Sequence, residues 1–287
     1  MYSTLSELLT WGKVTLQNAG VTDFQISAEL LLATLLKFSR TQFLLNPFQK
    51  IDPQIEEEYK KLIGRRAVRE PLQYLIGWVD FYNIRLRVDN RALIPRPETE
   101  ILVETIINKL KGDHLKILDI GTGTGNIAIA LARNITGSKV TGIDISPDAL
   151  EIAKINAGLN DIDEHVSLIE GTVFDSEFIK KLGYFDAVIS NPPYVDYGDK
   201  NKLEPEIVNH EPIIALFSES DPLRFFKTIT GIISYILNGG GLLAFEVGQG
   251  QASDVCEFMK LDFRDIEITK DLAGIERVVT GIYAGTN

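Results

Sequence analysis

The first 75 residues carry apolar side chains three and four positions apart, which is the spacing of one face of a helix. Thr4 and Glu7 form a capping-box pattern ahead of the first such run. Asp23 can cap a second run, and Asp52 followed by Pro53 is typical of the start of a third. The pattern therefore predicts a small helical bundle over residues 1–75.

The apolar period changes after this bundle. Residues 84–88 alternate between apolar and polar side chains, which indicates a half-buried strand. Residues 78–82 are expected to pair with it across a turn near Asn83. Residues 76–96 are therefore predicted to form a β-hairpin linker, and Pro97 is expected to open the helix that follows.

From residue 115 onward, apolar strands alternate with helical segments, as in a parallel α/β sheet. Strands are expected near residues 115–120, 139–144, 165–170, 185–190 and 241–247, and helices near 125–134, 147–158, 222–237 and 250–260. Residues 263–269 and 276–283 are interpreted as a terminal strand pair. Seven strands, two of which close one edge, predict a Rossmann-like class I methyltransferase domain over residues 97–287.

The composition fits a soluble globular protein. Of the 287 residues, 45% are hydrophobic and 24% are charged. No run of about 18 apolar residues occurs, and the first twenty residues lack the basic segment of a targeting signal. With a single cysteine and three scattered histidines, no metal site is expected. The cytoplasm is the expected location.

The net charge of −11 is unevenly distributed. Residues 1–97 carry 13 Lys and Arg against 10 Asp and Glu, whereas the rest of the chain is strongly acidic. An acidic half repels a phosphate backbone at long range. Duplex nucleic acid is therefore a poor first expectation for the substrate, and no direct nucleic-acid or membrane partner is predicted.

The strand at residues 116–120 ends in three alternating glycines. Glycine adopts positive φ and allows close approach of the backbone to a ligand, and the following helix directs free N–H groups toward the loop. The spacing G-x-G-x-G, with an acidic residue two positions before the first glycine, favours S-adenosylmethionine over a dinucleotide. A tight structural turn is the alternative. The predicted cofactor-binding residues here are Asp119, Gly121, Thr122, Gly123, Thr124 and Gly125.

Asp144 lies at the end of the second predicted strand, 19 residues after Gly125. At this place in related α/β folds, an acidic side chain accepts hydrogen bonds from ribose hydroxyls. The alternative is an N-cap for the helix that opens at Pro147, a role that Ser146 fits better. Asp144 is therefore predicted to bind the ribose of the cofactor.

The tetrapeptide Asn191–Tyr194 directly follows the fourth predicted strand of the sheet. A planar amide or amine nitrogen is a poor nucleophile, because its lone pair is delocalised. The Asn191 side-chain oxygen and the Pro192 carbonyl can accept its two N–H groups and stabilise the charge that develops there. Pro193 stiffens the segment, and Tyr194 offers a flat face. The alternative is an Asn-Pro turn that carries a packed tyrosine.

With these residues in place, the chain closely resembles the release-factor glutamine methyltransferases over nearly its whole length. The resemblance rests on the glycine loop, on Asn191–Tyr194 and on the segments 69–74, 93–100, 211–212, 239–248 and 271–277. It implies methylation of the side-chain amide of the glutamine in the Gly-Gly-Gln motif of peptide chain release factors, with S-adenosylmethionine converted to S-adenosylhomocysteine. The amino-terminal bundle would help to dock the release factor.

The resemblance also implies roles for particular residues. Those expected to border the cofactor are Gly121, Gly123, Gly125, Asp144, Val173 and Asn191, and Asn191–Tyr194 would hold the glutamine. The family commonly has Asp at the position of Thr172, so this chain lacks a carboxylate for the adenine there. The resemblance then leaves the Val173 backbone to contact the adenine.

Two other functions share parts of this pattern. Adenine-N6 methyltransferases of DNA or RNA also carry N-P-P-Y, but a basic groove or an appended recognition domain would be expected, and the sequence indicates neither. A non-catalytic cofactor-binding subunit is the third possibility. The Pro95-Arg96-Pro97-Glu98 segment and the helical amino-terminal part favour the glutamine methyltransferase.

Overall fold

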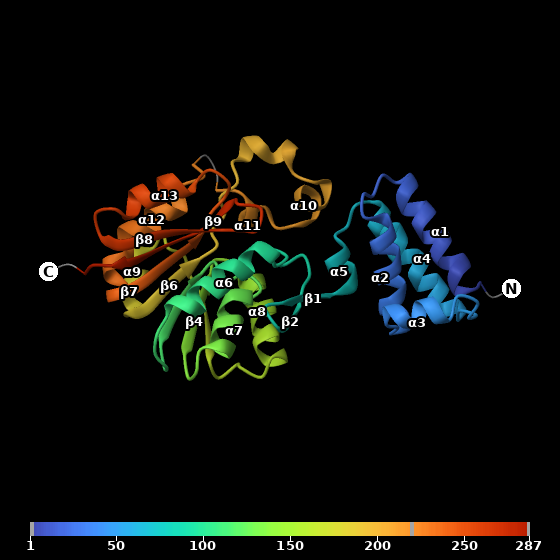
Figure 1. The fold of residues 1–287 in the computed structure, drawn as a ribbon, viewed down its shortest axis with the longest axis horizontal. Coiled ribbons are helices and arrows are strands. Elements are labelled where there is room, and N and C mark those ends of the chain that lie inside the picture. The colour runs from blue at the N-terminus through green and yellow to red at the C-terminus, as the bar shows by residue number, and fades with distance from the viewer. Residues whose placement is uncertain (1–2, 219–220, 286–287) are drawn as a thin grey trace. The chain divides into compact units, whose positions relative to one another are not determined.

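The computed structural model describes residues 3–218 and 221–285. The chain forms two compact units (Figure 1). The first runs to Trp78 and also includes Leu203–His210. The second comprises Val79–Lys202 and the described chain from Glu211 onward.

The first unit is helical, as predicted. Its helices are α1 (Leu5–Asn18), α2 (Phe24–Leu36), α3 (Arg40–Leu45), α4 (Pro53–Ala67), α5 (Leu72–Ile76) and the sequence-distant α10 (Pro205–His210). Apolar side chains from α1, α2 and α4 form one core, in which Leu16, Leu31 and Tyr59 are fully buried. The Tyr59 hydroxyl donates a hydrogen bond to the Ala28 carbonyl, which satisfies its polar end.

The predicted helix starts are correct, but one capping mechanism is not. Thr4 and Glu7 make both bonds of the capping box, and Asp52 accepts from the Gln54 N–H. Asp23 precedes α2 without capping it. Its carboxylate instead accepts hydrogen bonds from Ser27 and Arg66. The short helices α3 and α5 were not predicted, because one or two turns carry little periodic signal.

A buried ion-pair network holds α10 in the first unit. The Arg66 side chain is only 4% exposed and contacts Asp23 at 2.7 Å and Glu206 at 2.9 Å. Arg69 contacts the other oxygen of Glu206 at 2.7 Å. Burial opposes the charge on Glu206, but the hydrogen bonds from Arg69 and Arg66 prevail and lower its pKa. Residues 203–210 are thus tied to helices more than a hundred positions earlier.

The predicted hairpin is present. Strands β1 (Trp78–Phe81) and β2 (Ile84–Arg87) form a two-stranded sheet. Tyr82 and Asn83 connect them with φ angles of 40° and 63°, the positive values that a two-residue I′ turn requires.

The second unit contains the predicted seven-stranded sheet, with the order β5-β4-β3-β6-β7-β9-β8. The strands are β3 (Lys116–Ile120), β4 (Lys139–Asp144), β5 (Val166–Glu170), β6 (Phe185–Ser190), β7 (Leu237–Glu246), β8 (Phe263–Lys270) and β9 (Glu276–Tyr283). Strands β3 to β7 run parallel, and β9 pairs antiparallel with both β7 and β8. This is the class I methyltransferase topology.

Helices cover both faces of this sheet (Figure 1). One face packs against α6 (Pro97–Lys109), α7 (Asn126–Asn134) and α8 (Pro147–Leu159), and the other against α9 (Ser176–Lys181), α12 (Arg224–Ile232) and α13 (Ala252–Met259). Successive residues of β3 alternate between the two cores: Ile117 belongs to the first and Leu118 to the second. Burial on both faces explains why the central strands are mostly apolar.

Three departures from prediction concern the chain after β6. Strand β7 begins at Leu237, before the three glycines, and its pairing with β6 shifts register between Phe185 and Ala187. The connection from β6 to α12 also contains short elements that the sequence did not predict, namely η1 (Tyr197–Lys202), α10 and α11 (Ile213–Leu216). The predicted helix near 222–237 ends as the short turn η2 (Ile233–Tyr235).

Within the described ranges, no helix is long and apolar enough to cross a bilayer. The same ranges hold no cluster of three His, Cys, Asp or Glu side chains suited to a metal ion.

Asn156 of α8 joins the hairpin to the glycine loop. Its side chain is fully buried and bonds to the backbone N–H and carbonyl of Arg87 and to the carbonyl of Thr124. These three bonds satisfy polar groups that water does not reach. Asn156 therefore helps to fix the glycine loop against α8 and β2.

We expect Asn156→Ala to lower the free energy of unfolding by about 2–4 kcal/mol, because it leaves buried backbone groups without partners. Urea denaturation measures the change. Asn108→Ala, at an exposed position of α6, is the matched control and should change stability by less than about 0.5 kcal/mol. Equal stability of the two variants would contradict this role.

Candidate active site

Strands β3 and β6 are parallel neighbours, and their register pairs Ile120 with Ser190. The Ser190 hydroxyl also donates a 2.8 Å hydrogen bond to the Ile120 carbonyl, which locks the two strand ends together. The glycine loop starts one residue after Ile120, and Asn191 follows Ser190 directly. Both motifs therefore leave the same edge of the sheet, where ligands bind in open α/β folds.

A cavity of about 600 Å³ opens at this edge. Of the predicted site residues, those that line it are Gly121, Gly123, Asp144, Val173, Asn191, Pro192 and Pro193. Those that do not line it are Asp119, Thr122, Thr124, Gly125 and Tyr194. The volume suits a nucleoside-bearing ligand.

The three glycines of the loop are needed for two different reasons. Gly121, Gly123 and Gly125 all have positive φ, at 74°, 53° and 79°. A Cβ on Gly121 or Gly123 would meet no atom within 4 Å, so their backbone lies open beside the cavity. A Cβ on Gly125 would lie 3.0 Å from Ile129 and 3.2 Å from Ala153. Gly125 therefore allows α7 and α8 to pack closely.

Asp119 is buried behind the loop. Its carboxylate accepts a 2.6 Å hydrogen bond from the Thr122 hydroxyl. Burial raises the pKa of Asp119 to about 7, although the hydrogen bond from Thr122 acts to lower it. Asp119 is thus placed to shape the loop from beneath, with no exposure to the cavity.

Asp144 faces the cavity and holds the loop at the same time. One carboxylate oxygen accepts from the Gly123 N–H and the other from the Ser146 N–H, both at 2.9 Å. Burial raises the pKa of Asp144, and the backbone hydrogen bonds oppose this rise. Ser146 caps α8 through its bond to the Ala149 N–H, as predicted. Because Ser146 caps α8, Asp144 is not needed as the cap and can face a ligand.

An aromatic wall that the sequence interpretation missed continues the cavity beyond Val173. Phe174 packs edge-on against Phe225, with ring centroids 5.1 Å apart, and the Arg224 guanidinium lies 4.2 Å from the Phe174 centroid. All three residues line the cavity. The adjacency of Phe174 to Val173 is the only sequence signal for it, because Phe225 comes from the distant helix α12.

Asn191 is oriented by Thr99, a residue distant from it in the sequence. Its Nδ2 donates a 3.2 Å hydrogen bond to the hydroxyl of Thr99, in the first turn of α6. The Tyr194 hydroxyl donates to Glu246 at 3.3 Å, and the Tyr194 carbonyl accepts from Gln251 at 3.0 Å. The two ends of the tetrapeptide are therefore anchored on different elements. Thr99, Glu246 and Gln251 had no individual role in the sequence prediction.

The segment before α6 is held by a buried carboxylate. Glu211, whose side chain is 2% exposed, contacts the Arg96 guanidinium at 2.6 Å and accepts from the Ile94 N–H at 3.3 Å. This pair links residues 93–100 to the chain just before α11, at the rim of the cavity. The sequence contained both segments but gave no sign that they pair.

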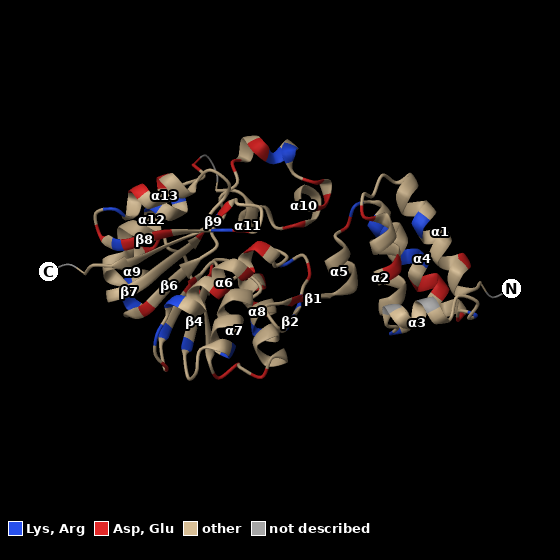
Figure 2. Cartoon of the chain, in the orientation of Figure 1, with Lys and Arg blue, Asp and Glu red and all other residues tan. Residues whose placement is uncertain are grey.

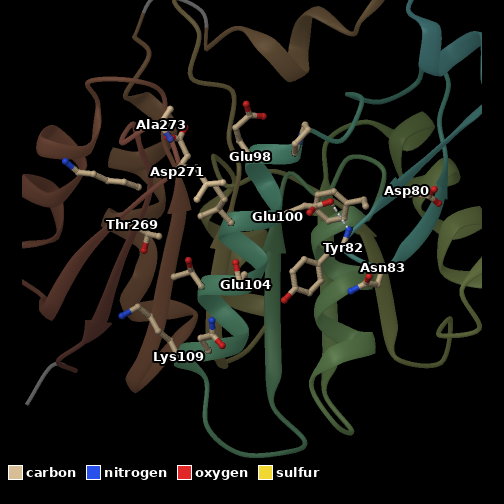
Figure 3. A pocket seen from close by; sticks show the side chains of 17 residues that line it. Asp80, Tyr82, Asn83, Glu98, Glu100, Glu104, Lys109, Thr269, Asp271 and Ala273 are labelled. Carbon is tan, nitrogen blue, oxygen red and sulfur yellow. Dashed lines mark hydrogen bonds between the residues drawn. The ribbon is translucent and has the colours of Figure 1, made fainter. Parts of the chain in front are cut away.

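A second cavity, of about 1210 Å³, lies along α6 and shares no lining residue with the first (Figure 3). Glu98, Glu100 and Glu104 project from α6 along it, and Asp80 lies at the hairpin. Glu100 accepts a hydrogen bond from the Tyr82 N–H. The acidic character of this region (Figure 2) is unfavourable for a phosphate backbone.

Comparison with known proteins places the chain in a family. The family model described as the PrmC N-terminal domain matches residues 7–77, and a methyltransferase domain model matches residues 111–269. The release factor glutamine methyltransferase of Deinococcus radiodurans is 36% identical over 98% of this chain and 99% of its own length. This chain belongs to the release factor glutamine methyltransferases. The relative from Thermodesulfovibrio yellowstonii is 41% identical over 88% of this chain and 90% of its length.

Solved structures agree with the fold. A methyltransferase from Pyrococcus furiosus, 20% identical, superposes with a TM-score of 0.52 over 72% of this chain and 91% of its own. The catalytic domain of hMettl16, 14% identical, gives a TM-score of 0.54 over 84% of this chain and 86% of its own. The chain is thus an S-adenosylmethionine-dependent methyltransferase of the class I fold, as the sequence predicted.

Asp144→Ala should weaken the binding of S-adenosylhomocysteine at least about tenfold, because hydrogen bonds to a charged group contribute about 1.5–3 kcal/mol each. Isothermal titration calorimetry measures the dissociation constant. A change below about twofold would remove Asp144 from the cofactor site.

Asp119→Asn should change the pH dependence of stability. Folding raises the pKa of Asp119 from 3.8 to about 7. At a pH below 3.8 the group is protonated in both the folded and the unfolded protein, and its contribution to stability is fully present. This contribution is lost as the pH rises from 3.8 to about 7, because the folded protein then keeps a proton that the unfolded protein releases. The wild type should therefore lose stability relative to the variant as the pH rises from 4 to 8, by on the order of 2 kcal/mol. Glu246 titrates in both proteins, so its contribution cancels. Parallel urea-stability curves over this range would contradict the assignment.

Proposed function

We propose that this protein transfers a methyl group from S-adenosylmethionine to the side-chain amide nitrogen, N5, of the glutamine in the Gly-Gly-Gln motif of peptide chain release factors. The names of its relatives support this substrate class. The reaction type rests on one observation, the Asn191 amide at the cavity wall. Asn191 Nδ2 donates its hydrogen bond to Thr99, so Oδ1 is the amide atom that remains to accept a hydrogen bond from the nitrogen that receives the methyl group.

The chemistry follows from the acceptor. A carboxamide nitrogen carries two N–H groups in one plane and has little nucleophilicity. Asn191 Oδ1 and the Pro192 carbonyl would accept these two N–H groups, hold the nitrogen in line and stabilise the positive charge that develops on it. Bound S-adenosylmethionine would supply an electrophilic methyl group on sulfonium. No strong base is needed, because the proton can leave once transfer has begun.

The residues that we propose for the cofactor are the open backbone of Gly121 and Gly123, the Asp144 carboxylate for the ribose hydroxyls, and the Val173 backbone for the adenine. Asp119, Thr122, Thr124 and Gly125 support the loop from behind, and Asn191 borders both ligands. In this proposal Pro193 stiffens the acceptor segment. Tyr194 does not line the cavity, so in this proposal it holds the acceptor segment in place through the bond of its hydroxyl to Glu246, and its flat face is not assigned to the glutamine.

We assign the substrate contacts by region. Residues 1–75 dock the release factor, residues 76–96 act as the linker, and residues 97–287 carry out methyl transfer. Release factors act on cytoplasmic ribosomes, so the enzyme is expected in the cytoplasm. No direct nucleic-acid contact is part of the proposal, which agrees with the acidic second cavity.

Adenine-N6 methylation of DNA or RNA is the competing function, and the family membership does not favour it. A radiolabelled methyl-transfer assay distinguishes the two. Purified release factor should accept the label, whereas its Gly-Gly-Gln variant with Gln→Ala, plasmid DNA and a short RNA should not. Labelling of nucleic acid in place of the release factor would overturn the proposal.

Asn191→Ala should lower kcat for the release factor by roughly 10²–10³, because it removes a preorganised acceptor of the amide N–H. Single-turnover measurements at saturating cofactor give the rate. The dissociation constant for S-adenosylhomocysteine should change much less than the rate. Unchanged turnover would remove Asn191 from the reaction.

A further inference from the structure

We infer that Glu206 is a positioning residue, which lets the helical bundle set the position of one wall of the active-site cavity. It lies in a loop, residues 195–218, that directly follows the acceptor segment Asn191–Tyr194 and is called the strap below. The tip of the strap, Leu203–His210, belongs to the first unit, whereas the residues on either side of the tip belong to the second. The inference rests on the proposed function, since it assigns how docking on the bundle acts on the acceptor side of the cavity.

The two ends of the strap are bonded to each other beside the acceptor segment. Val195 and Phe217 form an isolated parallel β-bridge, in which the Val195 N–H donates to the Leu216 carbonyl at 3.2 Å. The Tyr197 ring packs edge-on against the Phe217 ring, with centroids 5.1 Å apart. Because Val195 directly follows Tyr194, these contacts place the base of the strap next to the acceptor segment.

The strap also forms part of the cavity wall. Residues 212–215, at the start of α11, line the cavity and are called the α11 wall. Helix α11 has only four residues, and a single helical turn has little stability of its own. The position of the α11 wall therefore depends on the contacts that hold the strap on either side of it.

One of these contacts lies within the second unit, directly before the α11 wall. Glu211 accepts hydrogen bonds from the Arg96 guanidinium at 2.6 Å and from the Ile94 N–H at 3.3 Å. The Glu211 side chain is buried, so water does not compete for these bonds. They tie the start of the α11 wall to the segment before α6.

The other contact is made by Glu206, near the start of α10, and lies within the first unit. Its two carboxylate oxygens bind different arginines, Oε1 to Arg66 at 2.9 Å and Oε2 to Arg69 at 2.7 Å. Each arginine has a further partner in the bundle, Arg66 in Asp23 and Arg69 in the Gly20 carbonyl. Two charge-assisted bonds from different side chains fix the orientation of the carboxylate as well as its distance.

A short helical connection joins these two contacts. Helix α10 spans Pro205–His210, and Glu211 follows its last residue directly. A helical turn does not stretch as an extended loop does, because backbone hydrogen bonds hold its residues at a fixed rise. A displacement of Glu206 by the bundle therefore reaches Glu211, and with it the α11 wall.

This arrangement joins two parts of the proposed function. A release factor that docks on the bundle biases the α11 wall through Glu206, to the extent that it moves α10. The proposed cofactor contacts lie at the ends of β3, β4 and β5, and none of them is on the strap. Loss of the Glu206 contact should therefore affect the protein substrate and the cofactor differently.

Hydrogen–deuterium exchange of the full-length protein, without ligands, tests the strap. Glu206→Gln removes the charge that both arginines bind, and Arg69→Gln removes one of the two bonds from the side of the bundle. In both variants, peptides that cover residues 211–218 should exchange at least about fivefold faster than in the wild type. Glu204→Gln, at an exposed position just before α10, is the matched control and should stay within about twofold of the wild type.

The same data separate positioning from loss of the bundle. The amides of α1 and α2, whose apolar core does not include Glu206, should exchange as in the wild type. If their exchange rose together with that of residues 211–218, the bundle itself would have unfolded and the positioning role would be wrong. A response in Glu206→Gln but not in Arg69→Gln would place the effect in α10 alone and would also contradict the inference.

Kinetics measure the consequence for the reaction. In Glu206→Gln and Arg69→Gln, kcat/KM for the release factor should fall about 5–20-fold, while the dissociation constant for S-adenosylhomocysteine stays within about twofold of the wild type. An equal loss of cofactor affinity would mean that the whole cavity is distorted, and would overturn the positioning role.

The exchange measurement requires neither methyl donor nor release factor. A wild type that methylates no release factor therefore contradicts the proposed function, whereas exchange of residues 211–218 that does not respond to Glu206→Gln contradicts the strap. The two failures are distinguishable.

Discussion

The parallel pairing of β3 with β6 is the constraint on which the site depends. Its register sets Ile120 beside Ser190, and the Ser190 hydroxyl closes the gap with a bond to the Ile120 carbonyl. The loops that follow these residues carry the glycines and Asn191, and both line one cavity. A shift of one residue in this register would turn every side chain of the strand to the other face and separate the two loops.

Buried or half-buried carboxyl groups hold several loops of the site in place. Asp119 supports the glycine loop through Thr122, Asp144 binds the Gly123 N–H, Glu211 binds Arg96 before α6, and Glu246 lies beneath Asn191–Tyr194. Each is costly to bury, and for Asp119, Asp144 and Glu246 burial is the largest influence on the pKa. Such groups are expected where geometry matters more than stability.

The sequence predicted what local patterns determine. The bounds of every sheet strand except β7, the glycine loop and the place of Asn191 follow from apolar periodicity and from residue types that neighbour each other in the chain. Pairings between distant residues left no such signal. Asp23 bonds to Arg66 rather than capping its helix, Glu206 binds Arg66 from 140 positions away, and the short helices between β6 and α12 are too brief to show a period. The partners of Asn191 were hidden for the same reason.

The most direct test of the central claim is a crystal structure with S-adenosylhomocysteine and a glutamine peptide bound. The sulfur and the glutamine amide nitrogen should lie within a few ångströms of each other, between Gly121 and Asn191, with the amide nitrogen facing Asn191 Oδ1. A nucleoside bound away from the ends of β3 and β6, or a glutamine side chain held elsewhere, would contradict the account.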